Sequence, residues 1–285
     1  MTFLMIMYEL MQVTEHKRMN GGDDIKVKDI VVIKCGGSTI SELSDAFFKS
    51  VVQMKRSGKY PIVVHGGGPM INQLLQKLEI KSEFVDGLRK TTEDVLETAE
   101  MVLCGRVNKQ LVTNIQLAGG LAIGLSGCDA KLLEVTPINE GMLGFVGEPV
   151  AVNTSLLNSL LEQDMIPIIA PIGINELGTH YNVNADSAAG AIAKALQADQ
   201  LVFVTDVDGI LKDGDCLQTV VAQEIEEMVI DGTIYGGMIP KVKAALATLA
   251  DVESVMIMNG KDTTIQEDGS IKGTVITKSH VQTHV

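Results

Sequence analysis

The sequence predicts a doubly wound α/β fold, in which helices cover both faces of a mainly parallel sheet. The first observation is that short, fully apolar runs alternate with amphipathic segments along the 285 residues, as they do in βαβ units. The second is that several apolar runs end in glycines just before a helical pattern. Ligands in such folds bind at the carboxyl ends of the parallel strands, so we expect the site there.

The clearest strand, turn and helix unit lies at residues 60–78. An apolar run is followed by three glycines at 66–68, and Pro69 then stands at the first helical position, where its missing N–H is not needed. Apolar side chains recur at helical spacing over 71–78. Glycine amides and a helix N-terminus attract anions. We therefore predict an anion site, although a tight turn with nothing bound would leave the same pattern.

A second unit of this kind opens the compact part of the chain. Residues 30–33 form an apolar strand, Lys34 stands at its end, Gly36 and Gly37 follow, and a helix is expected over 43–56. A lysine that faces glycine N–H groups is a phosphate-binding arrangement. The alternative, a solvated lysine at the end of a strand, stays open for this residue taken alone.

The middle of the chain predicts a helix whose start Thr91 caps, with the loop residue Arg89 just before it. An arginine fork suits a carboxylate, although an exposed loop arginine is the simpler interpretation. The helix has a wide apolar face that suggests a subunit interface. That face consists of Val95, Leu96, Ala99, Val102 and Leu103.

Further strands and helices complete this half of the chain. The apolar run from Leu121 is a strand, and short alternating runs over 133–152 predict surface β-hairpins that would serve as a lid. A helix near 156–163 and an apolar strand over 165–173 follow.

Two polar clusters mark the last third of the chain. Asn182, Asn184 and Asp186 crowd the start of an alanine-rich helix, where capping by Asn184 or Asp186 explains one of the three. Lys241 falls in the first turn of a later helix, where a cation is unfavourable unless an anionic partner is near. Residues 253–260 form a last strand, and the chain from Lys261 is expected to give a polar turn and an edge segment.

Composition excludes several classes of protein. The net charge of −13 and the absence of a basic run argue against a nucleic-acid partner. The four cysteines contain no C-x-x-C pair, which suits reduced thiols, and Cys35 is expected to be a small buried residue. No apolar run is long enough to span a membrane, so we expect a cytoplasmic protein. Residues 1–28 form an N-terminal extension of undecided role.

The glycine-lined strand ends, two lysines, one arginine and one aspartate suit phosphoryl transfer. The Walker and protein-kinase motifs are absent, and the glycines do not meet the G-x-G-x-x-G spacing of dinucleotide-binding enzymes. A non-catalytic sensor of amino acids or nucleotides is the other alternative, and ATP turnover would exclude it.

Six sequence motifs, in order from residue 34 to residue 242, resemble those of a known family. They are KCGGST (34–39), HGGGP (65–69), GLRKTT (87–92), NVNAD (182–186), TDVDGI (205–210) and GGMIPKV (236–242). Together they resemble the amino acid kinase family, and within it the members that phosphorylate N-acetyl-L-glutamate in arginine biosynthesis. Another acid kinase of the same fold is the alternative within the family.

The resemblance implies an open αβα sandwich with two lobes. Residues 29–197 would form the lobe that binds acetylglutamate and makes the dimer, and residues 198–285 the ATP-binding lobe. Transfer of the γ-phosphoryl group to the γ-carboxylate would need no general base, because that carboxylate is already ionised. Mg²⁺ would be carried by the ATP phosphates, with no protein metal ligand, and an arginine-insensitive homodimer is expected.

The resemblance also implies the role of each matching residue. Lys34 and Lys241 would stabilise the transferring phosphoryl group, and Asp186 would hold both lysines. The substrate would contact Gly67, Gly68, Leu88, Arg89 and Asn182. The phosphates and the nucleotide would contact Gly36, Gly37, Asn184, Thr205, Asp206, Asp208, Gly209, Ile210, Leu211, Lys212, Gly236, Gly237 and Met238. His65 would orient backbone rather than transfer protons.

Overall fold

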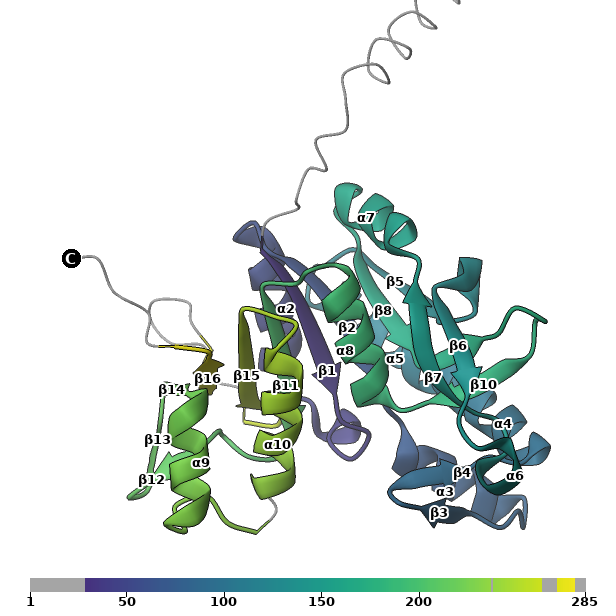
Figure 1. The fold of residues 1–285 in the computed structure, drawn as a ribbon. Helices are drawn as coiled ribbons and strands as arrows, with labels where there is room; N and C mark the ends of the chain where they lie inside the picture. The colour runs from purple at the N-terminus through teal and green to yellow at the C-terminus, as the bar shows by residue number, and fades with distance from the viewer. Residues whose placement is uncertain (1–28, 237, 263–270, 280–285) are drawn as a thin grey trace, which may run out of the picture.

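The computed structural model describes residues 29–236, 238–262 and 271–279, and it shows an eight-stranded sheet between two layers of helices (Figure 1). All neighbouring strands of this sheet are parallel except β15 and β16. The predicted open αβα sandwich is confirmed. In spatial order the strands are β14 (Thr219–Val221), β16 (Thr274–Thr277), β15 (Ser254–Asn259), β11 (Gln200–Thr205), β1 (Ile30–Cys35), β2 (Tyr60–His65), β8 (Ile166–Ala170) and β5 (Ala122–Ser126).

The two faces of the sheet belong to two separate apolar cores. Side chains alternate along each strand, so Val31 and Ile33 enter one core while Val32 enters the other. The core that contains Val31 packs against α2 (Asp45–Arg56), α3 (Gly68–Lys77), α4 (Glu93–Glu100) and α5 (Asn108–Leu117). The opposite core packs against α7 (Thr154–Glu162), α8 (Ala185–Ala195), α9 (Ala222–Ile230) and α10 (Met238–Leu249).

Both predicted strand, glycine and helix units are present. β1 and β2 are neighbours in register, with Lys34 beside Val64 and Cys35 beside His65. Helix α3 begins at Gly68 with Pro69 in its first turn. Helix α2 is capped by Ser44, whose hydroxyl accepts a hydrogen bond from the N–H of Phe47 at 3.2 Å. The two glycine turns therefore lie side by side at one end of the sheet.

The hairpin predicted over 133–152 exists and takes part in a larger unit. Strands β6 (Leu133–Pro137) and β7 (Val146–Val152), with α6 (Glu140–Leu143) between them, close a small barrel with β9 (Ile172–Ile174) and β10 (His180–Val183). Leu133, Val135 and Val146 are buried, so the hairpin is only partly a surface element. Its role as a lid stays a prediction.

The prediction that Thr91 caps a helix is wrong. Helix α4 follows Thr92, which makes no capping hydrogen bond through its side chain, and Thr91 is buried. The Thr91 hydroxyl donates instead to the carbonyl of Arg89 at 2.8 Å. The apolar face after it continues through a π-helical stretch (Met101–Val107) into α5, and most of that face is buried within this chain. The apolar width of this helix therefore needs no second subunit to explain it.

Four features of the C-terminal part differ from the prediction or were not predicted. β16 is not at the edge of the sheet, because β14 pairs with it on its outer side. No prediction covered α9, β14 or the short hairpin of β12 (Leu211–Lys212) and β13 (Asp215–Cys216). The expectations for the extension at 1–28 and for Gly237 lie outside the described residues. None of the helices in the described ranges is long and apolar enough to cross a membrane.

Candidate active site

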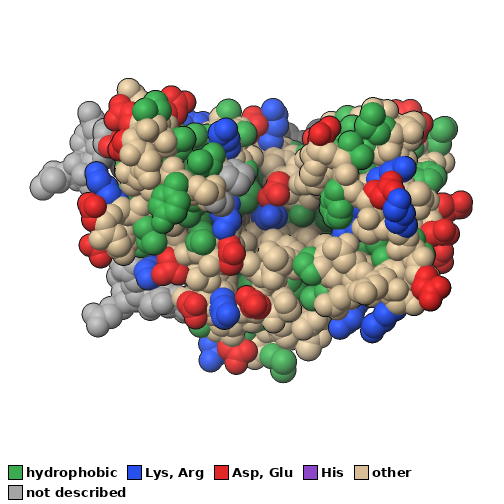
Figure 2. All heavy atoms as spheres, turned by 90° about the horizontal axis from the view of Figure 1, so that it is seen from below, with side chains coloured by type: hydrophobic (Ala, Val, Ile, Leu, Met, Phe, Trp, Pro, Cys, Tyr) green, Lys and Arg blue, Asp and Glu red, His purple; other side chains and the backbone are tan. Residues whose placement is uncertain are grey.

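Two adjoining cavities lie at the carboxyl ends of the central strands. Seen from that end, the molecule is hollowed between its two halves, and basic and acidic side chains gather at the hollow (Figure 2). The first cavity has a volume of about 280 Å³ and the second about 260 Å³. Lys34, Ser38 and Asp186 line both, so one lysine faces two binding spaces.

Lys34 and Asp186 form the ion pair at the junction of the cavities. The Lys34 Nζ atom lies 2.9 Å from Asp186 Oδ1, and the lysine side chain is only 17% exposed. Asn184 settles the alternative left open for the cap of α8, because its Oδ1 accepts hydrogen bonds from the N–H groups of Asp186 and Ser187. Capping by Asn184 leaves the Asp186 carboxylate free to orient the lysine.

The two glycine turns converge on the first cavity. A Cβ atom built on Gly37 would lie 2.8 Å from the amide nitrogens of both Gly67 and Gly68, so no larger residue fits there without displacing the backbone. A Cβ atom on Gly67 would lie 2.6 Å from the Leu103 side chain. The turns thus bring main-chain N–H groups close together beside Lys34, which makes an anion-binding surface.

His65 fixes the second glycine turn from behind. Its ring is fully buried, Nδ1 donates to the Gly66 carbonyl at 2.9 Å, and Nε2 accepts from the Asn108 amide at 3.3 Å. Burial lowers the pKa of His65 to about 4, so the imidazole is neutral at physiological pH. This placement agrees with the expectation that His65 orients backbone.

Arg89 lies on strand β4 (Leu88–Lys90) of a hairpin with β3 (Glu83–Val85), not in a loop, and it is 7% exposed. Its Nη1 donates to Asn72 Oδ1 at 2.7 Å, its Nη2 to the Gly68 carbonyl at 3.3 Å, and the Phe84 ring packs over the guanidinium. No carboxylate of the described ranges lies within ion-pair distance of it. The first cavity therefore contains a cation whose charge is not neutralised.

Asn182 and Leu88 complete the predicted lining of the first cavity. The Asn182 side chain donates to the Thr91 hydroxyl at 3.2 Å, which explains why Thr91 is buried here instead of capping a helix. Desolvation by burial lowers the pKa of Arg89, and an arginine guanidinium stays charged at neutral pH.

The second cavity contains the other predicted lysine. Lys241 Nζ lies 2.6 Å from Asp206 Oδ1, and its hydrogen bond holds the pKa of the Asp206 carboxyl below its ordinary value. The expectation that Asp186 holds both lysines is therefore wrong for this structure, in which Asp186 pairs with Lys34. Asp206 ends up beside the N-terminal turn of α10, where its charge also offsets the unfavourable position of Lys241.

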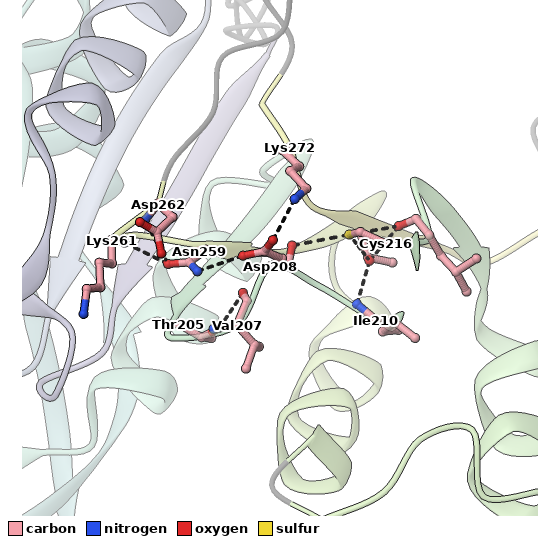
Figure 3. Close-up of polar contacts among 11 residues, drawn as sticks. Thr205, Val207, Asp208, Ile210, Cys216, Asn259, Lys261, Asp262 and Lys272 are labelled. Atoms are coloured by element: carbon pink, nitrogen blue, oxygen red, sulfur yellow. Dashed lines mark hydrogen bonds and ion pairs between the residues drawn. The ribbon is translucent and has the colours of Figure 1, made fainter. Parts of the chain in front are cut away.

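Several residues predicted to contact the nucleotide lie outside both cavities. These are Asp208, Gly209, Ile210, Leu211, Lys212, Gly236 and Met238. Leu211 and Lys212 are exposed in the β12–β13 hairpin, whereas Asp208 and Ile210 are bonded to the last strands (Figure 3). Gly36, Thr205 and Asp206 do line the second cavity, as predicted.

Some residues at the two cavities were not predicted. Ser38 lines both cavities, and its place after two glycines was the available signal. Phe203 and Ala244 line the second cavity and Asn72 binds Arg89, but none of them stands in a pattern that sets it apart from core or surface residues.

A model of the amino acid kinase family matches residues 29–259. The chain belongs to the amino acid kinase family. The resemblance carried by the six motifs is thereby confirmed.

Relatives of this amino acid kinase include proteins named acetylglutamate kinase. The protein from Halalkalibacterium halodurans is 54% identical over 251 residues, which are 88% of this chain and 96% of that protein. The protein from Geobacillus kaustophilus is 53% identical over 87% of this chain and 96% of its own length. Among solved structures, smu.665 from Streptococcus mutans UA159 matches with a TM-score of 0.74 and 32% identity over 88% of this chain and 100% of that chain.

The carbamate kinase from Giardia lamblia bound to AMP-PNP shares the fold of this amino acid kinase. Its TM-score is 0.62 at 16% identity, over 90% of this chain and 100% of that chain. The fold is thus shared with a protein of much lower sequence identity.

Proposed function

We propose that this protein phosphorylates the γ-carboxylate of N-acetyl-L-glutamate with ATP, giving N-acetyl-L-glutamyl 5-phosphate for arginine biosynthesis. The observation that carries the proposal is that Lys34 faces two adjoining cavities, of which one holds an arginine with no carboxylate partner among the described residues. Relatives named acetylglutamate kinase at about half identity over nearly their whole length support the choice of substrate.

The first cavity suits an acid with a carboxylate at each end. Arg89 would bind the α-carboxylate through its free N–H groups, and Asn182 and Leu88 would contact the rest of the molecule. The γ-carboxylate would then point toward Lys34 and the amides of Gly67 and Gly68. A carboxylate there is already the nucleophile, because its ordinary pKa is about 4.3.

The second cavity suits the nucleotide phosphates. Lys241, Thr205 and Gly36 line it, and it adjoins the first cavity at Lys34. We propose that Lys34 and Lys241 neutralise the charge of the transferring phosphoryl group, since positioning and charge stabilisation supply most of the catalysis in such reactions. Asp186 would orient Lys34, and Gly37 would donate its N–H to a phosphoryl oxygen.

No protein group has to accept a proton. The neutral and fully buried His65 is bonded on both ring nitrogens, so it is not available as a base. Attack by the ionised carboxylate on the γ-phosphorus forms an O–P bond as the bond to the β-phosphate oxygen breaks. The electron pair leaves on ADP, which balances the reaction without a general base.

We propose that Mg²⁺ enters with ATP. The carboxylates of Asp186 and Asp206 are each bound to a lysine, and the described residues contain no group of three metal ligands. This donor set fits a cation held by the ATP phosphates, where it would add to the charge neutralisation that the lysines supply.

The remaining assignments rest on this function. We propose a cytoplasmic homodimer, with acid-binding and dimerising residues at 29–197 and nucleotide-binding residues at 198–285. Leu117 and Leu121 are strongly exposed next to β5, which ends the large sheet, and such exposed apolar side chains favour an interface. Light scattering gives the mass, and a monomer would exclude the dimer.

The test is ATP-dependent acyl-phosphate formation trapped with hydroxylamine. N-acetyl-L-glutamate is offered beside glutamate, aspartate and carbamate, and Lys34→Ala serves as the inactive control. Hydroxamate with N-acetyl-L-glutamate alone supports the proposal. Turnover with a different acid would replace the substrate but keep the fold and the lysines. Binding of ATP or acid without turnover would favour the alternative of a non-catalytic sensor.

A further inference from the structure

The loop after β11 is fastened to the last two strands of the sheet by one carboxylate. Asp208 Oδ1 accepts a hydrogen bond from the Asn259 amide at 2.8 Å, and Asp208 Oδ2 lies 2.7 Å from Lys272 Nζ (Figure 3). Asn259 ends β15, and Lys272 precedes β16 by two residues. Both carboxylate oxygens of Asp208 are thus bonded, and Asp208 lines neither cavity.

The same loop carries a residue of the second cavity. Asp206 lies two positions before Asp208, and its carboxylate binds Lys241 at 2.6 Å. A continuous series of contacts therefore connects Lys272 and Asn259 through the loop to the Lys241 ammonium. The contacts of Asp208 and Asp206 are hydrogen bonds with a charged partner, which are stronger than those between neutral groups, and the backbone of Val207 joins the two aspartates.

The chain beyond Asp208 has little freedom to move independently. The Ile210 N–H donates to Thr274 Oγ1 at 2.8 Å, and Thr274 Oγ1 donates to the Leu217 carbonyl at 2.7 Å. Gly209 adopts a φ of +146°, and a Cβ atom there would lie 2.4 Å from Thr274 Oγ1. Before Asp208, the Val207 N–H donates to Thr205 Oγ1 at 3.2 Å, and the Gly260 N–H donates to the Thr205 carbonyl at 3.0 Å. Asp208 lies between this turn and the part of the loop that is bonded to β16.

We propose that Asp208 is a positioning residue for the nucleotide, which acts by holding Asp206, and through it Lys241, at the second cavity. The inference rests on the proposed function, in which that cavity takes the ATP phosphates. Without the Asp208 contacts, Asp206 and Lys241 would occupy more positions in the free protein. Ordering them would then cost affinity for ATP and lower the rate of transfer, with no effect on the acid site.

The experiment measures Mg-ATP binding by calorimetry without the acid, and then KM and kcat for both substrates. The variants are Asp208→Asn, Lys272→Met and the two combined. We expect each single variant to weaken ATP binding and raise the KM for ATP roughly 3- to 10-fold, a modest loss because the pair is partly exposed. The KM for N-acetyl-L-glutamate should change less than about twofold. The double variant should be no worse than the worse single variant, since both remove one interaction.

Lys194→Met is the matched control. Lys194 pairs with Asp251 at 3.0 Å and lines neither cavity, and its side chain is 68% exposed against 44% for Lys272. It should leave both KM values unchanged. If the role of Asp208 is purely structural, Lys272→Met and the control should both lower the melting temperature by a similar amount. Neither should then change the KM for ATP selectively.

The outcomes separate the inference from the proposed function. Wild-type protein that binds no Mg-ATP would overturn the proposed function itself. If Asp208→Asn and Lys272→Met bind Mg-ATP as tightly as the wild type does, the proposed function stands and the positioning role is overturned. Equal rises in both KM values would also overturn it, because they would show a general disturbance of the fold.

Discussion

Lys34 Nζ and Asp186 Oδ1 lie 2.9 Å apart at the one place where the two cavities meet. Lys34 lies on strand β1 in the middle of the sheet, and Asp186 lies in the first turn of helix α8, far along the chain. A cation held in this way is positioned before either substrate binds. Its role in transfer is the basis of the predictions below.

Replacing either lysine should abolish most of the turnover and leave the fold intact. We expect Lys34→Ala and Lys241→Ala each to lower kcat by about 100-fold or more, the scale seen when one preorganised group that stabilises the transition state is removed. The measurement is kcat together with the melting temperature, with Lys194→Ala as the control. Unchanged turnover in either variant would remove that lysine from the mechanism.

Arg89 should control affinity for the acid. Losing a charged pair of hydrogen bonds in a desolvated site costs about 2–3 kcal/mol, so Arg89→Ala should raise the KM for N-acetyl-L-glutamate roughly 30- to 160-fold. The KM for ATP should stay within about twofold. Arg89→Lys keeps the charge but loses the planar fork, so it should recover only part of the affinity. Equal effects on both substrates would refute the assignment.

His65 should make stability fall with acid. Its pKa is lowered by burial from 6.5 to about 4 in the folded protein, so the unfolded chain binds the proton more readily. The contribution of His65 is therefore complete above pH 6.5 and is lost as the pH falls toward 4. The loss amounts to about 3 kcal/mol.

Denaturant unfolding at a series of pH values between 7 and 4 isolates this contribution when the wild type is compared with His65→Gln. The carboxylates titrate in both proteins and cancel in the difference. The difference in unfolding free energy should move in favour of the variant as the pH falls. A difference that is independent of pH would show that His65 is not buried as a neutral ring.

Cys35 should be dispensable for chemistry. Burial raises the pKa of its thiol to about 12, so the reactive thiolate is absent at neutral pH. Cys35→Ala should keep kcat within about threefold and lower stability by about 1 kcal/mol for the small cavity. A loss of kcat beyond 100-fold without loss of fold would instead indicate that Cys35 takes part in the chemistry.

Local patterns were enough to predict the sheet and much of the site. The glycine turns after β1 and β2 and the polar start of α8 are short-range signals, and parallel pairing brings all three to one end of the sheet. Lys34, Asp186, Arg89 and Asn182 therefore meet at the first cavity as expected.

The predictions that were wrong concern residues whose positions depend on contacts between distant segments of the chain. Which carboxylate pairs with Lys241 depends on how α10 sits against the end of β11, and no local pattern encodes that distance. Arg89 is buried because two three-residue strands fold over α3, and strands so short have no readable periodicity. The burial of Thr91 also depends on a distant segment, because the Thr91 hydroxyl accepts its hydrogen bond from Asn182, far along the chain.

The most direct test follows the oxygen of the acid. N-acetyl-L-glutamate labelled with ¹⁸O only in its γ-carboxylate is incubated with Mg-ATP and hydroxylamine, which attacks the acyl carbon and releases the phosphate. Phosphorus NMR then reads the label. The account predicts one ¹⁸O atom in each released phosphate, because the carboxylate oxygen attacks the γ-phosphorus. Phosphate without label, as water-driven hydrolysis of ATP would give, would contradict it.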